Sequence, residues 1–202
     1  MTSTSILTVN ALAVYDDGSG LALYAGGFFE MAGGTTVNRV AKWDGTSWSA
    51  LGGGIVGGIV NALAVHDDGT GPALFAAGSI VTAGGVGALG IARWNGTSWS
   101  ALGIGTNLVI DALAVYDDGS GPALFVGGSF NQAGGMDIYR IAKWDGASWA
   151  ALGDGMSGAV SALVAHDDGS GRSLFAGGGF STAGGVPSNG IAKWNGASWL
   201  PG

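Results

Sequence analysis

Four copies of a six-residue motif, Trp-(Asp/Asn)-Gly-(Thr/Ala)-Ser-Trp, constrain the fold of this chain more than any other feature. The copies contain all eight tryptophans of the chain, which are Trp43, Trp48, Trp94, Trp99, Trp144, Trp149, Trp194 and Trp199. Asp-Gly or Asn-Gly between extended segments favours a tight β-hairpin turn, because Gly and Asn tolerate the positive φ that such a turn needs. Each copy therefore predicts a hairpin with a tryptophan on either side of its turn.

The segments around these hairpins repeat as well. Equivalent alanines recur at spacings of 51, 50 and 50 residues, at Ala11, Ala62, Ala112 and Ala162. Each unit contains four strand-like segments, and four strands in about 50 residues is the period of a propeller blade. We predict an all-β chain, a β-propeller with four blades of four antiparallel strands in a single repeat domain, 1–202. The predicted blades are approximately 8–57, 58–107, 108–157 and 158–202, and a stacked-sheet solenoid is the alternative.

The first two strands of each unit predict closely packed sheets. In the segment 10–14, Leu12 and Val14 point to one face of the sheet while Ala11 and Ala13 point to the other. Both faces are apolar, so we expect both to be covered. The second strand carries a Gly-Gly or Ala-Gly pair, which predicts a bulge or the close approach of another backbone.

The segments Leu-Phe-Val-Gly-Gly-Ser-Phe (124–130), Ile-Ala-Lys-Trp-Asp-Gly (141–146) and Ser-Trp-Ala-Ala-Leu-Gly (148–153) resemble kelch-like propeller repeats. More narrowly, all four units are similar to the repeats of the fungal cortical cell-polarity marker family and of secreted repeat proteins from planctomycete-type bacteria. The resemblance implies an extracellular or cell-surface location. It implies no catalytic residue, because the family has no common catalytic set.

A second period of 100 to 101 residues alternates three positions between odd and even units. Tyr alternates with His, Arg with Gly, and Asp with Asn, at positions 15/66/116/166, 39/90/140/190 and 44/95/145/195. A duplicated two-unit block explains this pattern. We therefore expect two kinds of contact between neighbouring blades.

Composition excludes several classes of partner. Charged residues are only 10% of the chain, against a usual ~25%. The net charge is −7 and the seven basic residues are spread singly, so we expect no nucleic-acid partner.

The apolar runs are strand-length, which predicts no membrane span. Cysteine is absent. Residues 1–7 lack the basic and apolar regions of a signal peptide.

Four acidic turns hold eight of the fourteen carboxylates, namely Asp16, Asp17, Asp67, Asp68, Asp117, Asp118, Asp167 and Asp168. Asp beside backbone carbonyls suits Ca²⁺, which prefers six to eight oxygen ligands. However, Asp-Asp-Gly lacks the alternating spacing that aims carboxylates at one point, and Asp and Gly form turns readily. We therefore expect turns that need no cofactor or metal, with calcium at these aspartates as the alternative.

Two histidines and four basic residues also have two interpretations. His66 and His166 each precede an Asp pair, as a transition-metal or proton-transfer group would. Tyr fills the same place in the other units, which favours an amphipathic side chain at a strand end. A basic residue precedes the first Trp of each hairpin, and we expect its stem to pack along the sheet; these residues are Lys42, Arg93, Lys143 and Lys193.

No arrangement of residues predicts catalysis. Every Ser lies in a repeated turn or strand without an evident base, so we expect no enzyme. The paired tryptophans suit stacking on sugar rings, but their regular recurrence favours a role in stabilising the blade. We expect a non-catalytic structural, self-assembling or protein-interaction module that binds itself or a surface protein. The alternative is a glycan-binding lectin with equivalent sites between blades.

Assembly follows from the number of units. Four blades close a ring only around a tight axis, whereas two chains would close eight blades by two-fold symmetry. The two-unit period favours the second solution, because unit 4 of one chain meets unit 1 of the other as an even unit meets an odd one. We expect an eight-bladed homodimer, with a closed monomer or an open filament as alternatives.

Overall fold

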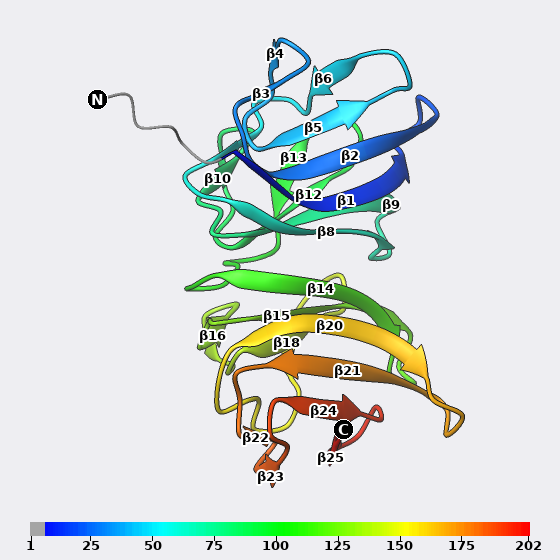
Figure 1. Ribbon diagram of the computed structural model, residues 1–202, viewed down its shortest axis with the longest axis vertical. Helices are drawn as coiled ribbons and strands as arrows, with labels where there is room; N and C mark the ends of the chain where they lie inside the picture. The colour runs from blue at the N-terminus through cyan, green and yellow to red at the C-terminus, as the bar shows by residue number, and fades with distance from the viewer. Residues whose placement is uncertain (1–6) are drawn as a thin grey trace.

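The computed structural model describes residues 7–202, which form short strands and contain no helix. Sixteen of the strands make four antiparallel sheets of four strands, one in each unit (Figure 1). The prediction of an all-β chain built from repeated four-stranded units is confirmed. The hairpins are confirmed too, because the two tryptophans of each motif are directly opposed across neighbouring strands.

The four sheets share one strand order. Sheet 1 has the order β1 (Thr8–Asp16), β2 (Leu21–Phe28), β5 (Val40–Trp43), β6 (Trp48–Ala50). Sheet 2 repeats it with β8 (Val60–Asp67), β9 (Pro72–Gly78), β12 (Ile91–Trp94) and β13 (Trp99–Ala101). Sheet 3 consists of β14 (Ile110–Asp117), β15 (Pro122–Gly128), β18 (Ile141–Trp144) and β19 (Trp149–Ala151). Sheet 4 consists of β20 (Val160–Asp167), β21 (Arg172–Gly178), β24 (Ile191–Trp194) and β25 (Trp199–Pro201).

The segment that the sequence predicts as a loop between the second and third strands contains a small hairpin. In unit 1 its strands are β3 (Met31–Ala32) and β4 (Thr35–Thr36), joined by Gly33 and Gly34 at positive φ. The later copies are β10 (Thr82–Ala83) with β11 (Val86–Gly87), β16 (Gln132–Ala133) with β17 (Met136–Asp137), and β22 (Thr182–Ala183) with β23 (Val186–Pro187). In addition, β7 (Ile55–Val56) pairs with β10, so the segment leading into unit 2 is hydrogen-bonded to that unit.

The predicted bulge is present in every sheet. The register between the first two strands shifts at Val9/Ala11 and at the equivalent place in the other units. Opposite the shift, a Cβ on Gly27 would lie 2.0 Å from the carbonyl oxygen of Thr8. Gly78, Gly128 and Gly178 are confined in the same way. The second glycine of each pair is therefore required by the close approach of the bulged strand.

The first strands of the sheets lie side by side in a row. Along the molecule, β1 is followed by β8, β14 and β20, and the remaining strands of each sheet fan away from the row (Figure 1). Sheets 1 and 4 are at opposite ends of the fan (Figure 1). We call the face of a sheet toward the preceding unit its leading face and the face toward the following unit its trailing face.

Most of the hydrophobic core lies at the three junctions between consecutive sheets, and a fourth, smaller cluster lies within unit 1 around Phe29 and Val37. At the first junction Tyr15, Tyr24 and Val40 on the trailing face of sheet 1 pack against Leu74 and Trp94 on the leading face of sheet 2. The second and third junctions repeat this arrangement, with Phe75 and Ile91 against Leu124, and Phe125 and Ile141 against Leu174. A sheet therefore depends on both of its neighbours to bury its apolar side chains.

Candidate interaction surfaces

The first aspartate of each acidic turn forms the turn itself. Asp16 Oδ1 accepts hydrogen bonds from the backbone N–H groups of Gly18 and Gly20, each at 2.9 Å. Asp67, Asp117 and Asp167 do the same in their units. Both glycines have positive φ, which makes glycine the favoured residue there. This aspartate acts as an Asx-turn acceptor.

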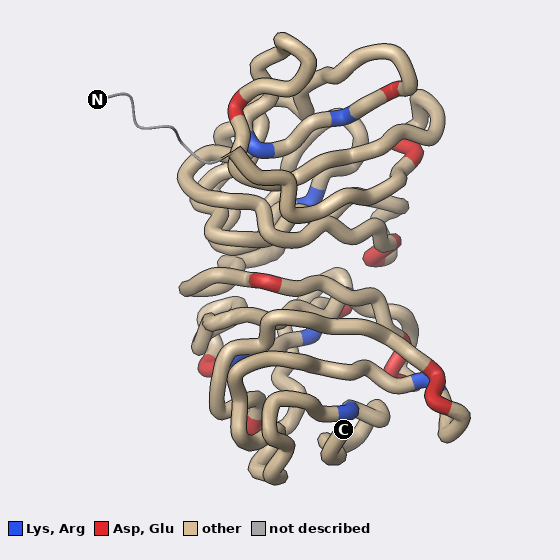
Figure 2. The backbone as a smooth tube through the Cα atoms, viewed as in Figure 1, with Lys and Arg blue, Asp and Glu red and all other residues tan. Residues whose placement is uncertain are grey.

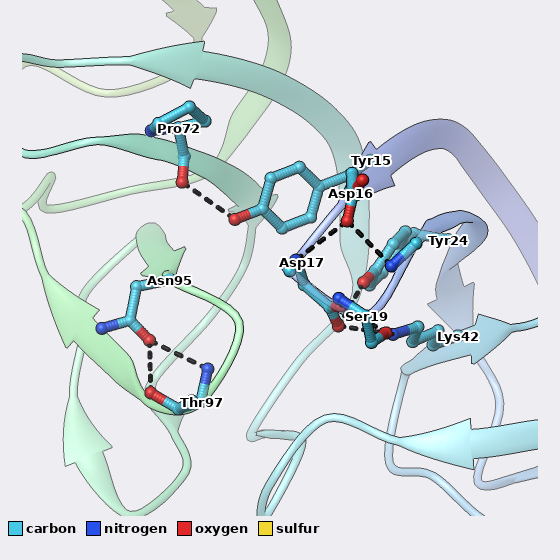
Figure 3. Close-up of polar contacts among 11 residues, drawn as sticks. Tyr15, Asp16, Asp17, Ser19, Tyr24, Lys42, Pro72, Asn95 and Thr97 are labelled. Carbon is cyan, nitrogen blue, oxygen red and sulfur yellow. Dashed lines mark hydrogen bonds and ion pairs between the residues drawn. The ribbon is translucent and has the colours of Figure 1, made fainter.

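The second aspartate binds the basic residue of the third strand. Asp17 Oδ2 accepts hydrogen bonds from Lys42 Nζ at 2.6 Å and from the Tyr24 hydroxyl at 2.8 Å (Figure 3). Burial acts to raise the pKa of Asp17, but the hydrogen bonds from Lys42, Ser19 and Tyr24 outweigh it and hold the pKa below its ordinary value. The equivalent ion pairs are Arg93–Asp68, Lys143–Asp118 and Lys193–Asp168.

These contacts describe what the eight turn aspartates do in the fold. The two members of each pair have different partners: the first accepts from two glycine N–H groups of its own turn, and the second accepts from the Ser or Thr of the turn and also pairs with a Lys or Arg on the third strand. Within residues 7–202 there is no group of three or more His, Asp or Glu side chains placed to hold a metal ion. The geometry of the aspartates thus fits the turn interpretation, and calcium binding remains untested.

The paired tryptophans connect neighbouring units. The second Trp of units 2 to 4 donates its indole N–H to a leucine carbonyl in the connection from the unit before, as from Trp99 to Leu51 at 2.8 Å. Trp149 and Trp199 repeat this bond with Leu102 and Leu152. The first Trp of these hairpins is equally buried, but its N–H finds no acceptor among the described residues. The rings within each hairpin lie 5.2 to 5.4 Å apart.

Odd and even units form different junctions with the unit that follows. The Tyr15 hydroxyl donates to the carbonyl of Pro72 in unit 2 at 2.8 Å (Figure 3). The Tyr116 hydroxyl donates to the carbonyl of Arg172 in unit 4 at 3.1 Å. Arg39 and Arg140 also reach across these junctions, to the carbonyls of Gly58 and Met156. The tyrosine and the arginine of the alternating set therefore both belong to the odd-to-even junction.

The even-to-odd junction lacks both of these bonds. Between units 2 and 3 the position of the tyrosine is taken by His66, which is only 6% exposed and whose Nε2 has no hydrogen-bond partner among the described residues. Gly90 replaces the arginine, and a Cβ there would meet the Thr106 hydroxyl at 2.1 Å. Burial lowers the pKa of His66, and the nearby carboxylates of Asp68 and Asp67 act in the opposite direction. The expected two kinds of junction are thus present.

The leading face of sheet 1 is bare at the end of the fan. Leu12 and Val14 are 61% and 60% exposed, and Leu23 is half-buried although its three counterparts are fully buried. Trp43 is likewise less buried than Trp94, Trp144 and Trp194. The glycines of the later hairpins, Gly96, Gly146 and Gly196, pack against the acidic turn of the unit before, whereas Gly45 has nothing within 4 Å of a Cβ. The expectation that both faces are covered fails here.

The trailing face of sheet 4 is bare at the other end. Ile191 is 49% exposed, whereas its counterparts Val40, Ile91 and Ile141 are fully buried. Phe175 is half-buried and His166 is exposed, in contrast to the buried Phe75 and His66. Val164, 57% exposed, replaces the alanine of the other units and so adds apolar surface to this face. Two apolar sheet faces thus remain uncovered, one at each end.

The rest of the surface formed by residues 7–202 offers no basic patch. Figure 2 shows the lysines and arginines separated from one another along the backbone. Four of the seven are paired with aspartates of the acidic turns, and Arg39 lies 3.5 Å from Glu30. No helix within residues 7–202 has the length and apolar character needed to cross a membrane.

The two bare faces are therefore the apolar surfaces that no other part of the described chain covers. Sequence reasoning predicted from the alternating positions that neighbouring units make two kinds of contact, but it could not show which bonds distinguish them. Comparisons of the chain with protein-family models, with curated proteins and with solved structures found no match.

Proposed function

We propose that the protein is a non-catalytic scaffold of the β-propeller type that assembles with itself through its two bare end faces. The four sheets serve as blades, and the row of first strands β1, β8, β14 and β20 lies nearest the axis, as in propellers. The observation that carries the proposal is the exposure of Leu12 and Val14 at one end and of Ile191 and Val164 at the other. An extracellular or cell-surface setting belongs to the same proposal and rests on the sequence resemblance alone.

The two bare faces have the residue types that pack together inside the chain. At each internal junction a trailing face with an aromatic and a β-branched residue meets a leading face with Leu and Trp. Sheet 4 presents Phe175 and Ile191, and sheet 1 presents Leu23 and Trp43. Association of sheet 4 with sheet 1 of a second chain would cover both sets. Two chains related by a two-fold axis make this contact twice and form a ring of eight blades.

Glycan binding is the alternative function. Stacking on a sugar requires an accessible ring face, whereas the six tryptophans of units 2 to 4 are buried. Only the pair in unit 1, Trp43 and Trp48, is half-buried, and this pair belongs to the bare leading face of sheet 1. The structure thus offers no set of equivalent exposed tryptophan sites. A glycan array tests the alternative, and micromolar binding to several sugars would favour it over a scaffold.

Light scattering at micromolar concentration tests self-assembly. We expect the chain to have twice the mass of one copy, or more if a filament forms. Leu12→Glu and Ile191→Glu should each give the mass of a single chain, because each places a carboxylate in the contact. Ile104→Glu is the matched control, since Ile104 is 65% exposed outside both end faces, and it should leave the mass unchanged.

The variants also distinguish the mode of contact. If sheet 1 paired with sheet 1 of the other chain, Leu12→Glu would dissociate the assembly but Ile191→Glu would not. That result would contradict contact between opposite ends. A wild-type mass of one chain throughout the micromolar range would overturn the proposal as a whole.

A further inference from the structure

The two kinds of junction determine which kind the bare faces can form. Sheet 4 is even, and its trailing face carries His166 and Gly190, as sheet 2 carries His66 and Gly90. Sheet 1 is odd, and its hairpin carries Asp44, as the hairpin of sheet 3 carries Asp145. The junction of sheets 2 and 3 is therefore the internal counterpart of a contact between sheet 4 and sheet 1.

We propose, resting on the proposed self-assembly, that sheet 4 docks on sheet 1 of a second copy in the way that sheet 2 docks on sheet 3. This contact between two chains, which we call the seam, buries His166, and acid dissociates the assembly. The occupant of each bare face is thus the opposite face of an identical chain. The seam is an even-to-odd junction with a histidine at the tyrosine position, and it lacks the hydrogen bonds that Tyr and Arg make in the odd-to-even junctions.

Three local contacts support this register. In the internal junction the hairpin at Gly146 lies against the carbonyl of Asp68, and the seam would place Gly45, which has open space around it, against Asp168. Ala77, the equivalent of Gly177 in sheet 2, is fully buried, whereas a Cβ on Gly177 would have Ala162 of the same sheet as its nearest neighbour, at 3.9 Å. A Cβ on Gly190 would meet the carbonyl oxygen of Gly178 in its own sheet, at 3.0 Å, but among the described residues no counterpart of the Thr106 hydroxyl that lies against Gly90. Each end of the chain thus lacks contacts that the internal junction makes.

The histidine makes this seam sensitive to pH. His66 shows the environment that His166 would enter: its ring lies 6.1 Å from that of Phe75, and its Nε2 lacks an acceptor. The charged groups near His66 in its own unit are Asp67, Asp68 and Arg93. The leading face of sheet 3 that packs against His66 is apolar, and the hairpin beside it carries Asp145. His166 has Asp167, Asp168 and Lys193 around it, and Asp44 would adjoin from the second copy.

The direction of the effect follows from burial. An imidazole that loses water without gaining an acceptor disfavours its charged form. Assembly is then complete above the ordinary histidine range, near pH 6.5, and weakens as the pH falls below it. Carboxylates ordinarily titrate lower, near pH 4, so imidazole is the kind of side chain whose ordinary range falls between pH 7.5 and 5.5.

The test compares the dissociation constant at pH 7.5 and pH 5.5 by sedimentation, with tryptophan fluorescence to confirm that the chain stays folded. We expect at least a ~10-fold weaker association at pH 5.5, because one pKa unit corresponds to tenfold in an equilibrium constant. His166→Tyr and His166→Gln should abolish this pH dependence, since neither side chain charges in this range. His66→Tyr is the matched control at the internal junction and should retain it.

The outcomes separate the two proposals. Association of equal strength at both pH values, or pH dependence that persists in both His166 variants, would overturn the histidine seam and leave self-assembly intact. Association at neither pH would overturn both. Loss of association at pH 5.5 in the wild type alone, with both His166 variants still associated, would support the seam as described.

Discussion

At the scale of single residues, the paired tryptophans separate the stability contributed by an indole N–H from that contributed by packing of the ring. Trp144 and Trp149 face each other in one hairpin and are buried to the same degree. Trp149 donates to the carbonyl of Leu102 at 3.0 Å, whereas the N–H of Trp144 has no acceptor within residues 7–202. Two tryptophans with the same packing thus differ in one hydrogen bond that joins two units.

Replacement by phenylalanine separates the two contributions. Trp144→Phe should cost only the lost packing, offset by removal of an unsatisfied donor. Trp149→Phe should destabilise the chain by about 1 kcal/mol more, because it also removes the hydrogen bond to the Leu102 carbonyl, which then keeps only the bond from the Gly105 N–H. Urea unfolding of both variants measures the difference. Equal losses of unfolding free energy would show that the Leu102 bond contributes nothing measurable.

At the scale of the element, each Gly-Gly pair serves two separate purposes. The second glycine lets the bulged first strand approach, and the first lets the next sheet approach. Within residues 7–202 no sheet packs on the trailing face of sheet 4, so only the second requirement applies there. Unit 2 carries Ala77 at the first position and still packs against sheet 3, which shows that alanine fits an even trailing face.

Alanine substitutions in β21 test this division. Gly178→Ala places a Cβ 2.1 Å from the carbonyl oxygen of Ala159, so the bulge must open, at a cost of about 1–3 kcal/mol. Gly177→Ala meets nothing closer than 3.9 Å and should be neutral or stabilise by up to ~1 kcal/mol, since glycine is unfavourable in strands. Thermal or urea melts of the two variants should therefore shift in different directions. A loss as large for Gly177→Ala would contradict the separate roles.

For the whole molecule, the repeat leaves each sheet dependent on its neighbours. Three cores lie between four sheets, so two faces remain bare however well each unit folds. Any arrangement that joins sheet 4 to sheet 1 would give every sheet two neighbours. The same need would be met if the two copies belonged to one polypeptide.

A tandem fusion tests this conclusion. Joining two copies directly keeps the spacing of equivalent alanines across the joint within the 50 to 51 residues of the repeats. We expect the fused chain to remain a monomer at concentrations where single copies pair, and to melt at a temperature independent of concentration. Ile191→Glu in the first copy is the control, since it disturbs the joint. Further association of the fused chain into filaments would show that eight units do not close.

The sequence by itself determined the units, because local signals specify them. Asx-Gly turns, opposed tryptophans and the Gly-Gly pair act over a few residues, so the hairpins, the bulge and the four-stranded units could be predicted. The small hairpin at Met31–Thr36 was missed, since its strands are too short to show a period. The alternation of Tyr15 and His66 predicted two kinds of contact between units, but not the hydrogen bond from Tyr15 to Pro72 that distinguishes them.

Only the tertiary structure decided which residues of different units contact one another. Tyr15 reaches Pro72 and Arg39 reaches Gly58 because consecutive sheets stack, a relation across 57 and 19 residues that no local signal records. Strand alternation assigns Leu12 and Leu63 to the same face, yet one is exposed and the other packs into a core. Burial depends on whether a neighbouring sheet is present, and a strand pattern is the same in both cases.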